Sequence, residues 1–230
     1  MDLSIIIPTL NEAEYLGRLL KQLKYGEKLR RQEILVVDGG SNDRTREVAQ
    51  QHSVRFLQSA PGRAIQLNYG AARAEGEILY FLHADTLPPA SFKKDIADSL
   101  AAGYHLGCYP FRLDSSNPLL RINSYMTRFR WLWCRGGDQS LFVLRSVFDS
   151  LKGFREDMKI MEEYDFLERA MKSYRFRIMP GEIGVSARKY AKNGYIRVQL
   201  ANLVAFNMYR RGYDSSKILQ TYKQMLSFEH

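Results

Sequence analysis

Acid-bearing, turn-forming segments occur at three places in the chain, each directly after a short apolar run: residues 8–12 (PTLNE), 38–43 (DGGSND) and 83–86 (HADT). In an open parallel sheet, ligands bind beyond the carboxyl ends of the strands. Asp38 suits hydrogen bonds to a base or ribose, and Asp85 suits Mg²⁺ or Mn²⁺ on a phosphate. One such segment alone is typical of a turn or a helix N-cap, but three together predict a ligand site.

A further acidic cluster, residues 162–165 (EEYD), opens a predicted helix. The helix dipole favours carboxylates in a first turn, which is one explanation of the cluster. It also follows residues 136–140 (GGDQS), a glycine-rich polar stretch that fits poorly in a core. Together the two segments predict a substrate-facing wall. His83 suits either a ligand contact or a partly buried imidazole at a strand end.

The elements that must position these residues alternate regularly in the first hundred residues. Apolar runs predict strands at 3–7, 34–37, 54–57 and 78–82, and they lack the polar alternation of half-exposed strands, so burial on both faces is expected. Helices are expected at 12–24, with Asn11 as N-cap, and at 44–51 and 64–74. This alternation predicts an α/β protein with a parallel sheet covered by helices on both faces.

The second half is less regular. Helices are predicted at 91–102, closed by Gly103, and at 162–172, 196–209 and 215–228. A strand is predicted at 141–144, and another at 106–113, where Pro110 favours an edge position. No linker or repeat divides the chain, so residues 1–230 are expected to form a single domain.

Composition excludes several classes. The chain has 230 residues, of which 45% are hydrophobic and 26% charged, so disordered and collagen-like proteins are excluded. Cys108 and Cys134 lack metal-ligand spacing, which excludes a zinc ribbon or disulfide scaffold and fits a reducing compartment. No apolar run approaches the roughly 18 residues of a spanning helix, and the N-terminus does not resemble a secretory signal. We therefore expect a cytoplasmic protein.

The net charge of +9 is concentrated at residues 169–211, which hold ten Lys or Arg and one acidic residue, Glu182. The segment suits a solvated surface, phosphate binding or weak association with anionic lipid headgroups. The segment also has an apolar stripe, which either packs on the core or takes part in lipid association. The stripe consists of Val198, Leu200, Ala201, Val204, Ala205 and Met208. Aromatic residues are too sparse there to favour nucleic acid. No P-loop or dinucleotide-binding glycine motif follows any strand.

The ordered motifs resemble family 2 glycosyltransferases of the GT-A fold, over roughly residues 3–190. The matching segments are residues 5–12, 36–45, 62–77, 82–85, 137–139 and 162–163. The HADT form, with GGDQ downstream and residues 186–190 (SARKY), resembles a subgroup of small stand-alone bacterial enzymes, some associated with arsenosugar biosynthesis.

The resemblance implies a Rossmann-like mixed sheet, mostly parallel and flanked by helices, with C-terminal helices. It implies inverting transfer of a sugar, typically a hexose, from a UDP- or GDP-sugar to an acceptor hydroxyl, often lipid-linked, with Mg²⁺ or Mn²⁺. Residues of about 1–105 would bind the nucleotide sugar, about 106–190 would face the acceptor, and about 191–230 would form the C-terminal helices. Peripheral attachment at the inner membrane face would follow from a lipid-linked acceptor.

The resemblance also implies roles for single residues. Thr9, Glu12 and Asp38 would hold the base and ribose, and Arg63 would lie near the base and diphosphate. Asp85 matches the last acid of the family's Asp-x-Asp motif and would bind the metal, while His83 replaces the first acid. Substrate binding is expected as well at Pro8, Gly39, Asp138, Gln139 and Arg188. For Arg188, beside Lys189, contact with the departing phosphates and simple surface charge are equal alternatives.

Glu163 matches the family's general base, usually an aspartate, and its neighbour Glu162 is expected to point elsewhere on the helix. One carboxylate on the acceptor side suffices for a one-step displacement. Two alternatives remain at this point. A nucleotidyltransferase also uses a metal at an α/β edge, and a nucleotide-sugar-binding protein without catalysis would explain the atypical His83 and Glu163.

Overall fold

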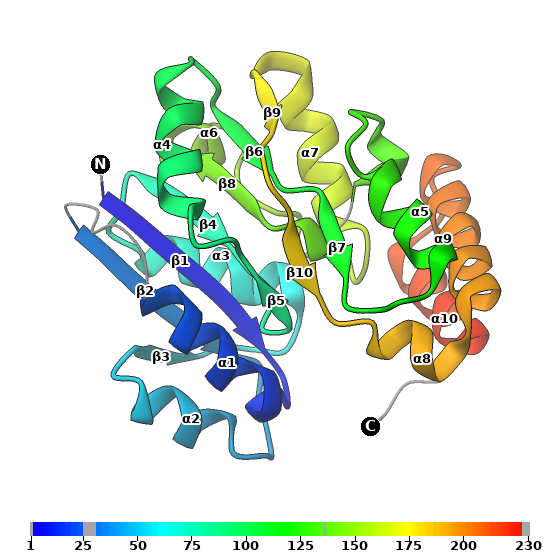
Figure 1. Cartoon of the computed structure of the whole chain (residues 1–230), viewed down its shortest axis with the longest axis horizontal. Coiled ribbons are helices and arrows are strands. Elements are labelled where there is room, and N and C mark those ends of the chain that lie inside the picture. Colours follow the sequence, from blue (N-terminus) through cyan, green and yellow to red (C-terminus); the bar gives the residue numbers. More distant parts are fainter. Residues whose placement is uncertain (1, 25–30, 136, 227–230) are drawn as a thin grey trace.

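A computed structural model describes residues 2–24, 31–135 and 137–226. Its centre is a seven-stranded sheet in the order β3-β2-β1-β4-β8-β6-β9 (Figure 1). Neighbours from β3 to β4 are parallel, β8 is antiparallel to β4 and β6, and β9 is parallel to β6. The strands are β1 (Asp2–Thr9), β2 (Arg31–Asp38), β3 (Arg55–Gln58), β4 (Ile78–Phe81), β6 (Leu106–Cys108), β8 (Leu141–Leu144) and β9 (Phe176–Ile178). The expected mixed, mostly parallel sheet is confirmed.

Helices cover both faces of this sheet. The helices are α1 (Ala13–Lys24), α2 (Thr45–Gln51), α3 (Arg63–Arg73), α4 (Phe92–Ala101), α5 (Pro118–Met126), α6 (Arg145–Ser150), α7 (Glu162–Ser173), α8 (Arg188–Asn193), α9 (Tyr195–Arg210) and α10 (Ser215–Met225). Residues of α1, α2 and α4 share one buried cluster with the sheet, and residues of α3, α6 and α7 share the other.

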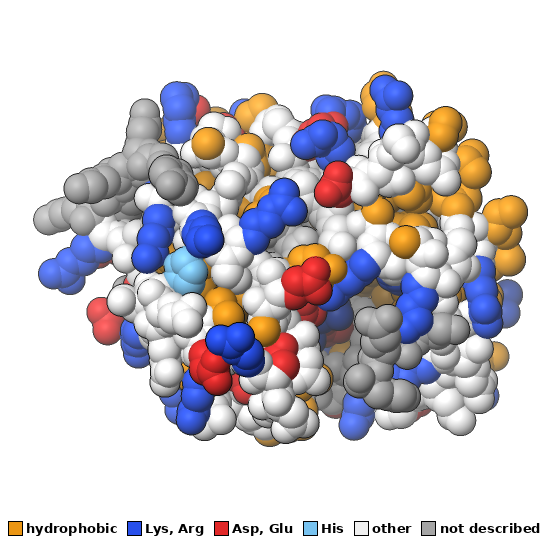
Figure 2. All heavy atoms as spheres, turned by 60° about the horizontal axis from the view of Figure 1, so that its bottom comes forward, with side chains coloured by type: hydrophobic (Ala, Val, Ile, Leu, Met, Phe, Trp, Pro, Cys, Tyr) orange, Lys and Arg blue, Asp and Glu red, His pale blue; other side chains and the backbone are white. Residues whose placement is uncertain are grey.

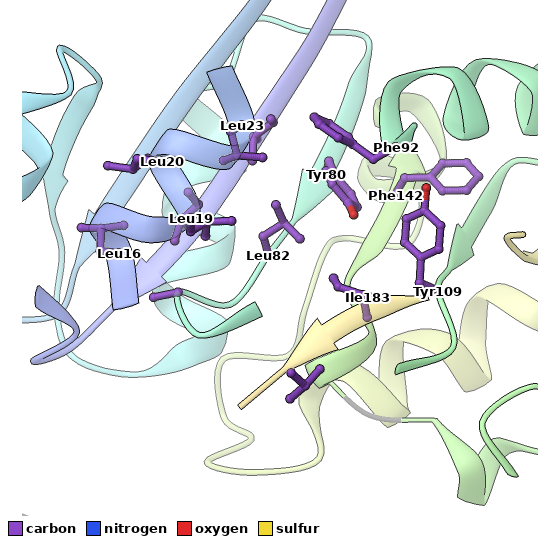
Figure 3. Close-up of a cluster of buried hydrophobic side chains, with 14 of the residues drawn as sticks. Leu16, Leu19, Leu20, Leu23, Tyr80, Leu82, Phe92, Tyr109, Phe142 and Ile183 are labelled. Atoms are coloured by element: carbon purple, nitrogen blue, oxygen red, sulfur yellow. The ribbon is translucent and has the colours of Figure 1, made fainter. Parts of the chain in front are cut away.

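Alternate residues of β1 supply these two clusters. Ile5 and Ile7 pack with the leucines of α1, whereas Ile6 packs with α3. All three are fully buried, as expected for a strand without polar alternation. Figure 3 shows the α1 side, where Leu16, Leu19, Leu20 and Leu23 point at the sheet and Tyr80 stacks on Phe92. The carboxyl ends of the central strands are thus fixed by a core on each side.

The predicted strand at 106–113 is wrong as one element. It divides at Tyr109 and Pro110 into β6 and β7 (Phe111–Leu113), which belong to different sheets. In the smaller sheet, β7 pairs with β10 (Ile183–Val185), which also pairs with β5 (Thr86–Leu87). The division occurs because Tyr109 N–H donates to Gln139 and the Pro110 carbonyl accepts from Ile183, so the chain changes partners there. β7 lies at an edge, as Pro110 predicted.

The last helices form a third cluster beside the sheet. Val198, Ala201 and Ala205 of α9 pack with α10 and with Met161, just before α7. Half of the predicted apolar stripe is therefore core, while Leu200 of the same helix is exposed. Within the described part of the chain, no helix combines the length and apolar character needed to cross a membrane. The predicted α10 residues 227 and 228 lie outside the described residues.

Candidate active site

The strand ends bring Thr9 and Asp38 together. β1 and β2 pair in register so that Thr9 lies opposite Asp38, and the Thr9 hydroxyl donates to Asp38 Oδ1 at 3.2 Å. Asp38 is only 2% exposed, and its carboxylate also accepts from the Gly40 and Ser41 amides and the Ser41 hydroxyl. In this structure the predicted nucleotide-binding carboxylate therefore holds its own loop in shape.

Gln66, in α3, braces the same two strand ends. Its Nε2 donates to the carbonyls of Thr9 and Val37, both at 2.8 Å. A Cβ on Gly39 would lie 3.1 Å from the Gln66 side chain, so glycine leaves room for this contact. The sequence analysis missed Gln66, because a glutamine inside a helix carries no local signal of contacts to two strands.

Asn11 is not the N-cap of α1. It has a left-handed φ of 56°, and its side chain accepts from the Asn42 amide. The free amides at the start of α1 are satisfied instead from the segment that leads from β2 into α2: Ala13 N–H donates to Asp43, and Glu12 N–H donates to Thr45. Because these side chains come from the segment after the neighbouring strand, the two acid-bearing segments hold each other in place.

Arg188, at the start of α8, joins two predicted site carboxylates. Its Nη2 lies 2.8 Å from Glu12 Oε1 and 3.1 Å from Asp85 Oδ2, and its guanidinium lies 4.5 Å from the Tyr15 ring centre. Burial raises the pKa of Glu12 despite the opposing charge of Arg188. The Arg188 side chain is 43% exposed and pairs with both carboxylates, so it closes the edge formed by the loops after β1 and β4, while its contact with the departing phosphates stays a prediction.

A second ionic group surrounds Glu163, in the first turn of α7. His83 Nε2 shares a hydrogen bond of 3.1 Å with Glu163 Oε1, and Arg63 Nη1 lies 3.9 Å from Glu163 Oε2. Burial alone would lower the pKa of His83, but the hydrogen bond and charge of Glu163 outweigh it and raise that pKa. The HADT segment thus contributes to both groups, through His83 to Glu163 and through Asp85 to Arg188.

Glu162 does not point away from this group. It is 2% exposed, its Oε1 lies 3.4 Å from Arg63 Nη1, and that oxygen accepts no hydrogen bond within the described chain. Burial raises the pKa of Glu162, against the opposing charge of Arg63. The expectation that Glu162 points elsewhere on the helix is therefore wrong, because both glutamates that follow the turn at Met161 lie near the same arginine.

Strained backbone conformations occur next to predicted site residues. Five non-glycine residues of the described chain have positive φ, and three of them adjoin predicted site residues: Asn11, Ser140 and Met161. A bulky residue such as Met161, with φ of 69°, is costly in this region, and such strain concentrates at functional sites. Met161 directly precedes Glu162 and Glu163, so α7 begins from a strained residue.

The remaining predicted residues are less directly placed. Gln139 is 1% exposed and donates to the Cys134 carbonyl at 3.0 Å, so its side chain supports the loop before β8. Asp138, in the 3₁₀ turn η2 (Gly137–Gln139), is exposed, and Pro8 is half-buried within β1. Contacts of Gln139 with a substrate would require this loop to rearrange.

The residues around Asp85 fit a divalent cation only if the donor supplies further oxygens. Among the residues that the structure describes, no three His, Cys, Asp or Glu side chains gather as a metal cluster. Mg²⁺ bound with a nucleotide commonly uses one or two carboxylates, with phosphate oxygens and water completing the shell. The Asp85 carboxylate, 19% exposed and paired with Arg188, suits this shared mode of binding.

Comparison with known proteins agrees with this geometry. The family model of "Glycosyl transferase family 2" matches residues 4–178. The curated "Glycosyltransferase AglE" of Haloferax volcanii is 35% identical over 95 residues, covering 37% of this chain and 31% of that protein. A "4,4'-diaponeurosporenoate glycosyltransferase" of Staphylococcus haemolyticus is 34% identical over 92 residues, covering 36% and 24%. The matched part is thus about a third or less of each relative.

Solved structures share the fold over nearly the whole chain. A mannosyltransferase from Pyrobaculum calidifontis, in complex with GDP-Man and Mn²⁺, has a TM-score of 0.68 and 21% identity, covering 97% of this chain and 69% of its own. S. aureus TarS 1–349 with UDP-GlcNAc has a TM-score of 0.66 and 16% identity, covering 98% and 71%. These likenesses establish the fold, and the family model decides the membership. The chain belongs to glycosyl transferase family 2.

Proposed function

We propose that this protein is an inverting glycosyltransferase that moves a sugar, a hexose in the simplest case, from a nucleoside diphosphate to an acceptor hydroxyl. The observation that carries the proposal is the pair of ionic groups at one strand edge. Arg188, Glu12 and Asp85 form the first, and Arg63 with Glu163 anchors the second. The first group has the chemistry to hold a diphosphate, and the second offers a carboxylate for proton transfer.

The donor belongs to the first group. Thr9, Glu12 and Asp38 line the ends of β1 and β2, where the base and ribose would bind, with UDP and GDP as the nucleotides to test. Asp85 would hold Mg²⁺ or Mn²⁺ together with the diphosphate. When bound, that cation supplies positive charge to the departing phosphates. Arg188 would then serve the diphosphate as well, because a guanidinium pairs bidentately with phosphate oxygens.

Glu163 is the proposed general base. Its side chain is 14% exposed, and His83 and Arg63 fix its two oxygens in direction. In the reaction Glu163 takes the proton of the acceptor hydroxyl as that oxygen bonds to the anomeric carbon. The bond from that carbon to the phosphate oxygen breaks in the same step, and its electron pair leaves with the nucleoside diphosphate. Attack from the opposite face inverts the anomeric centre.

Further assignments follow from the same proposal. Roughly residues 1–105 would bind the donor and 106–190 the acceptor, within one domain that ends in helices. The HADT motif at residues 83–86 supports placing the chain in the subgroup of small bacterial enzymes that share it, some of them associated with arsenosugar biosynthesis. The enzyme would act in the cytoplasm, and an acceptor carried on a lipid would bring it to the inner membrane face.

A donor assay tests the function. The protein is incubated with UDP- and GDP-sugars, with Mn²⁺ or with EDTA, and the released products are separated by chromatography. Release of a nucleoside diphosphate that depends on Mn²⁺ supports a glycosyltransferase. In a separate incubation with a nucleoside triphosphate and a sugar phosphate, release of pyrophosphate would instead identify a nucleotidyltransferase. Tight donor binding with neither product would identify a binding protein without catalysis.

A further inference from the structure

Exposed apolar side chains gather on one end of the molecule. Eleven large hydrophobic residues of the described chain are exposed, and nine of them come from two segments. The segment of α5 and the following 3₁₀ turn η1 (Leu132–Cys134) supplies Leu119, Ile122, Tyr125, Phe129, Trp131 and Trp133, and α9 supplies Ile196, Leu200 and Leu203. Patches of this kind mark interaction sites rather than ordinary surface. We call these nine residues the α5–α9 surface.

Four of its aromatic rings form a continuous ladder. Tyr125 meets Phe129 edge to face with 6.0 Å between ring centres, Phe129 stacks on Trp131 at 4.9 Å, and Trp131 stacks on Trp133 at 5.5 Å. The two tryptophans are the only ones in the chain, and they are 51% and 53% exposed. Large aromatic rings that stack on one another yet remain exposed to solvent are expected where another molecule or a membrane covers them.

The two segments lie side by side. The Tyr190 hydroxyl, in α8, accepts from Asn123 of α5 and from Gln199 of α9, so both helices meet at one side chain. Figure 1 places α5 and α9 at the same end of the molecule, and Figure 2 shows hydrophobic side chains gathered at that end. Because Arg188 lies two residues before Tyr190 in α8, the surface adjoins the candidate active site.

Basic residues without acidic ones accompany this surface. Residues 118–135 contain no Asp or Glu and three exposed arginines, while Arg135 is buried. α9 contains Arg197 and Arg210 and likewise no acid, although Arg210 lies near Glu168 of α7. Arg128 pairs with Glu182 at 2.6 Å, whereas no carboxylate of the described residues lies within ion-pair distance of Arg121 or Arg130, and both are exposed. The occupant of the surface must therefore accept aromatic rings and carry negative charge.

We propose that the α5–α9 surface docks on an anionic lipid bilayer. Trp and Tyr rings suit the region between headgroups and acyl chains, and nearby arginines are attracted to anionic headgroups. A second copy of the chain fits less well, because a symmetric contact would bring like-charged surfaces together. The lipid contact then lies on α5, η1 and the exposed side of α9, rather than along the whole basic segment 169–211. This proposal does not rest on the proposed function.

Vesicle co-sedimentation tests the proposal. The full chain is mixed with vesicles of phosphatidylcholine alone or of phosphatidylcholine with phosphatidylglycerol, and we expect sedimentation with the anionic vesicles only. Arg121→Gln should weaken that binding about fivefold, and Arg121→Gln/Arg130→Gln about 25-fold, as expected from the attraction of one basic residue to an anionic surface. Trp131→Ala/Trp133→Ala should weaken it at least as much as the double arginine variant.

Tyr104→Ala is the matched control. The guanidinium groups of Arg175 and Arg177 lie over the Tyr104 ring, so this residue too is an aromatic side chain beside arginines. Tyr104 lies before β6, whereas the α5–α9 surface begins after β7. This variant should bind anionic vesicles as the parent does. Thermal unfolding and binding of UDP or GDP check that each variant is folded with its site intact. If the tryptophan variant is not folded, the arginine variants, which change only exposed side chains, decide the question.

Three results would overturn the proposal. The first is equal sedimentation with neutral and anionic vesicles, or none with either. The second is unchanged binding in folded tryptophan or arginine variants. The third is a dimer, measured by light scattering, that is lost in the tryptophan variant while vesicles bind neither form, which would assign the surface to a second copy. If the parent protein binds anionic vesicles but turns over no donor, the proposed function is wrong and the lipid-docking proposal stands.

Discussion

Two arginines divide four carboxylates of the candidate site between them. Arg188 pairs with Glu12 and Asp85, and Arg63 lies near Glu162 and Glu163. Of these carboxylates, Glu163 combines partial exposure with a direct hydrogen bond to an imidazole. That combination makes it available for proton transfer, whereas Glu162 is enclosed.

Glu163→Gln should lower turnover by a factor of roughly 10²–10⁴, the usual cost of losing a positioned general base. Glutamine keeps the shape and can still hydrogen bond to His83, so binding of the nucleoside diphosphate should stay nearly unchanged. Turnover is measured by release of nucleoside diphosphate in the presence of an acceptor or water, and binding by calorimetry.

Glu168→Gln is the control for this prediction. Glu168 lies in the same helix but accepts from Tyr209 and lies near Arg210, away from both ionic groups. Its variant should keep normal turnover. Glu162→Gln is not a control, because it removes a charge next to Arg63. A fully active Glu163→Gln enzyme would refute the role of Glu163 and direct attention to Asp138.

The sequence located single site residues better than their partners. Thr9 and Asp38 end β1 and β2, and Asp85 follows β4, so the rule that ligands bind beyond strand ends predicts them as candidates without any structure. The pairing of Arg188 with Glu12 joins residues 176 positions apart, and that of His83 with Glu163 joins residues 80 apart. Spacing along the chain carries no information about such contacts, which depend on how α7 and α8 pack.

At the scale of elements, the contact of α3 with the sheet depends on Gly70. A Cβ there would lie 2.6 Å from Ile6 Cγ2 and 3.0 Å from Val37 Cγ2. Gly70→Ala should therefore lower the free energy of unfolding by about 1–3 kcal/mol, because the helix and sheet must separate slightly. Gly17→Ala, in α1, should raise it by up to about 1 kcal/mol, because its Cβ meets Val48 at 3.4 Å and alanine favours the helix.

Urea denaturation of both variants measures these changes. Opposite signs for two identical substitutions within helices would show that helix propensity decides at Gly17 and packing at Gly70. Destabilisation of equal size in the two variants would contradict the close contact of α3 with β1 and β2.

Glu33 couples the start of the sheet to pH. Burial opposes its charge, but hydrogen bonds from the Glu75 amide, Ser4 and Arg55 outweigh burial and lower the pKa of Glu33. A lowered folded-state pKa stabilises the fold above the unfolded-state pKa of about 4.3, and this is lost as pH falls through the folded-state value. Glu33→Gln should therefore cost about 1–2 kcal/mol at neutral pH and much less near pH 3.

Urea denaturation across this pH range checks the expectation. Glu75→Gln is the control. The Glu75 side chain is 81% exposed and its Oε1 lies 3.7 Å from Arg55 Nη1, and so loose and exposed an ion pair contributes little to the free energy of unfolding. A difference between parent and Glu33→Gln that stays constant from neutral pH to pH 3 would show that the charge of Glu33 does not matter.

The sequence predicted the elements with clear apolar runs and missed the shortest ones. β4 is apolar throughout, β1 and β2 hold uninterrupted apolar runs at residues 5–7 and 34–37, and α1 has a clear apolar face, so their patterns are unambiguous. β5, β9 and β10 have two or three residues each, too few to show a period. α5 is absent from the sequence prediction although its start is readable, since Asn117 caps it and Pro118 follows.

At the scale of the whole molecule, the family match and the candidate site do not end together. The family model covers residues 4–178, while Arg188 and helices α8 to α10 come later. The shared part supplies the sheet, Asp85 and Glu163. The later part supplies the arginine that pairs with Asp85 and one half of the α5–α9 surface.

Donor binding should stabilise the whole molecule and should depend on Asp85. At concentrations near 100 times its Kd, UDP or GDP with Mn²⁺ should raise Tm by about 5–10 °C, since a ligand at that level adds roughly 2.7 kcal/mol. EDTA should reduce this shift in the parent protein. In Asp85→Asn, Mn²⁺ and EDTA should give the same shift, as measured by thermal unfolding.

The control is Asp149→Asn, which alters an exposed carboxylate in α6 that belongs to neither ionic group. It should keep the full Mn²⁺ effect. An Asp85→Asn protein with the parent's Mn²⁺ dependence would remove Asp85 from the proposed metal site.

The ion pair of Arg188 with Asp85 has a consequence for how the protein is made. These two residues are 103 positions apart, so a ribosome adding about 5–20 residues per second needs roughly 5–20 s to make the second after the first. During that interval the four parallel strands β1 to β4 have already been synthesised, and Glu12 and Asp85 lack the arginine that joins them. A nascent chain therefore has this edge without its bridging guanidinium until translation reaches α8.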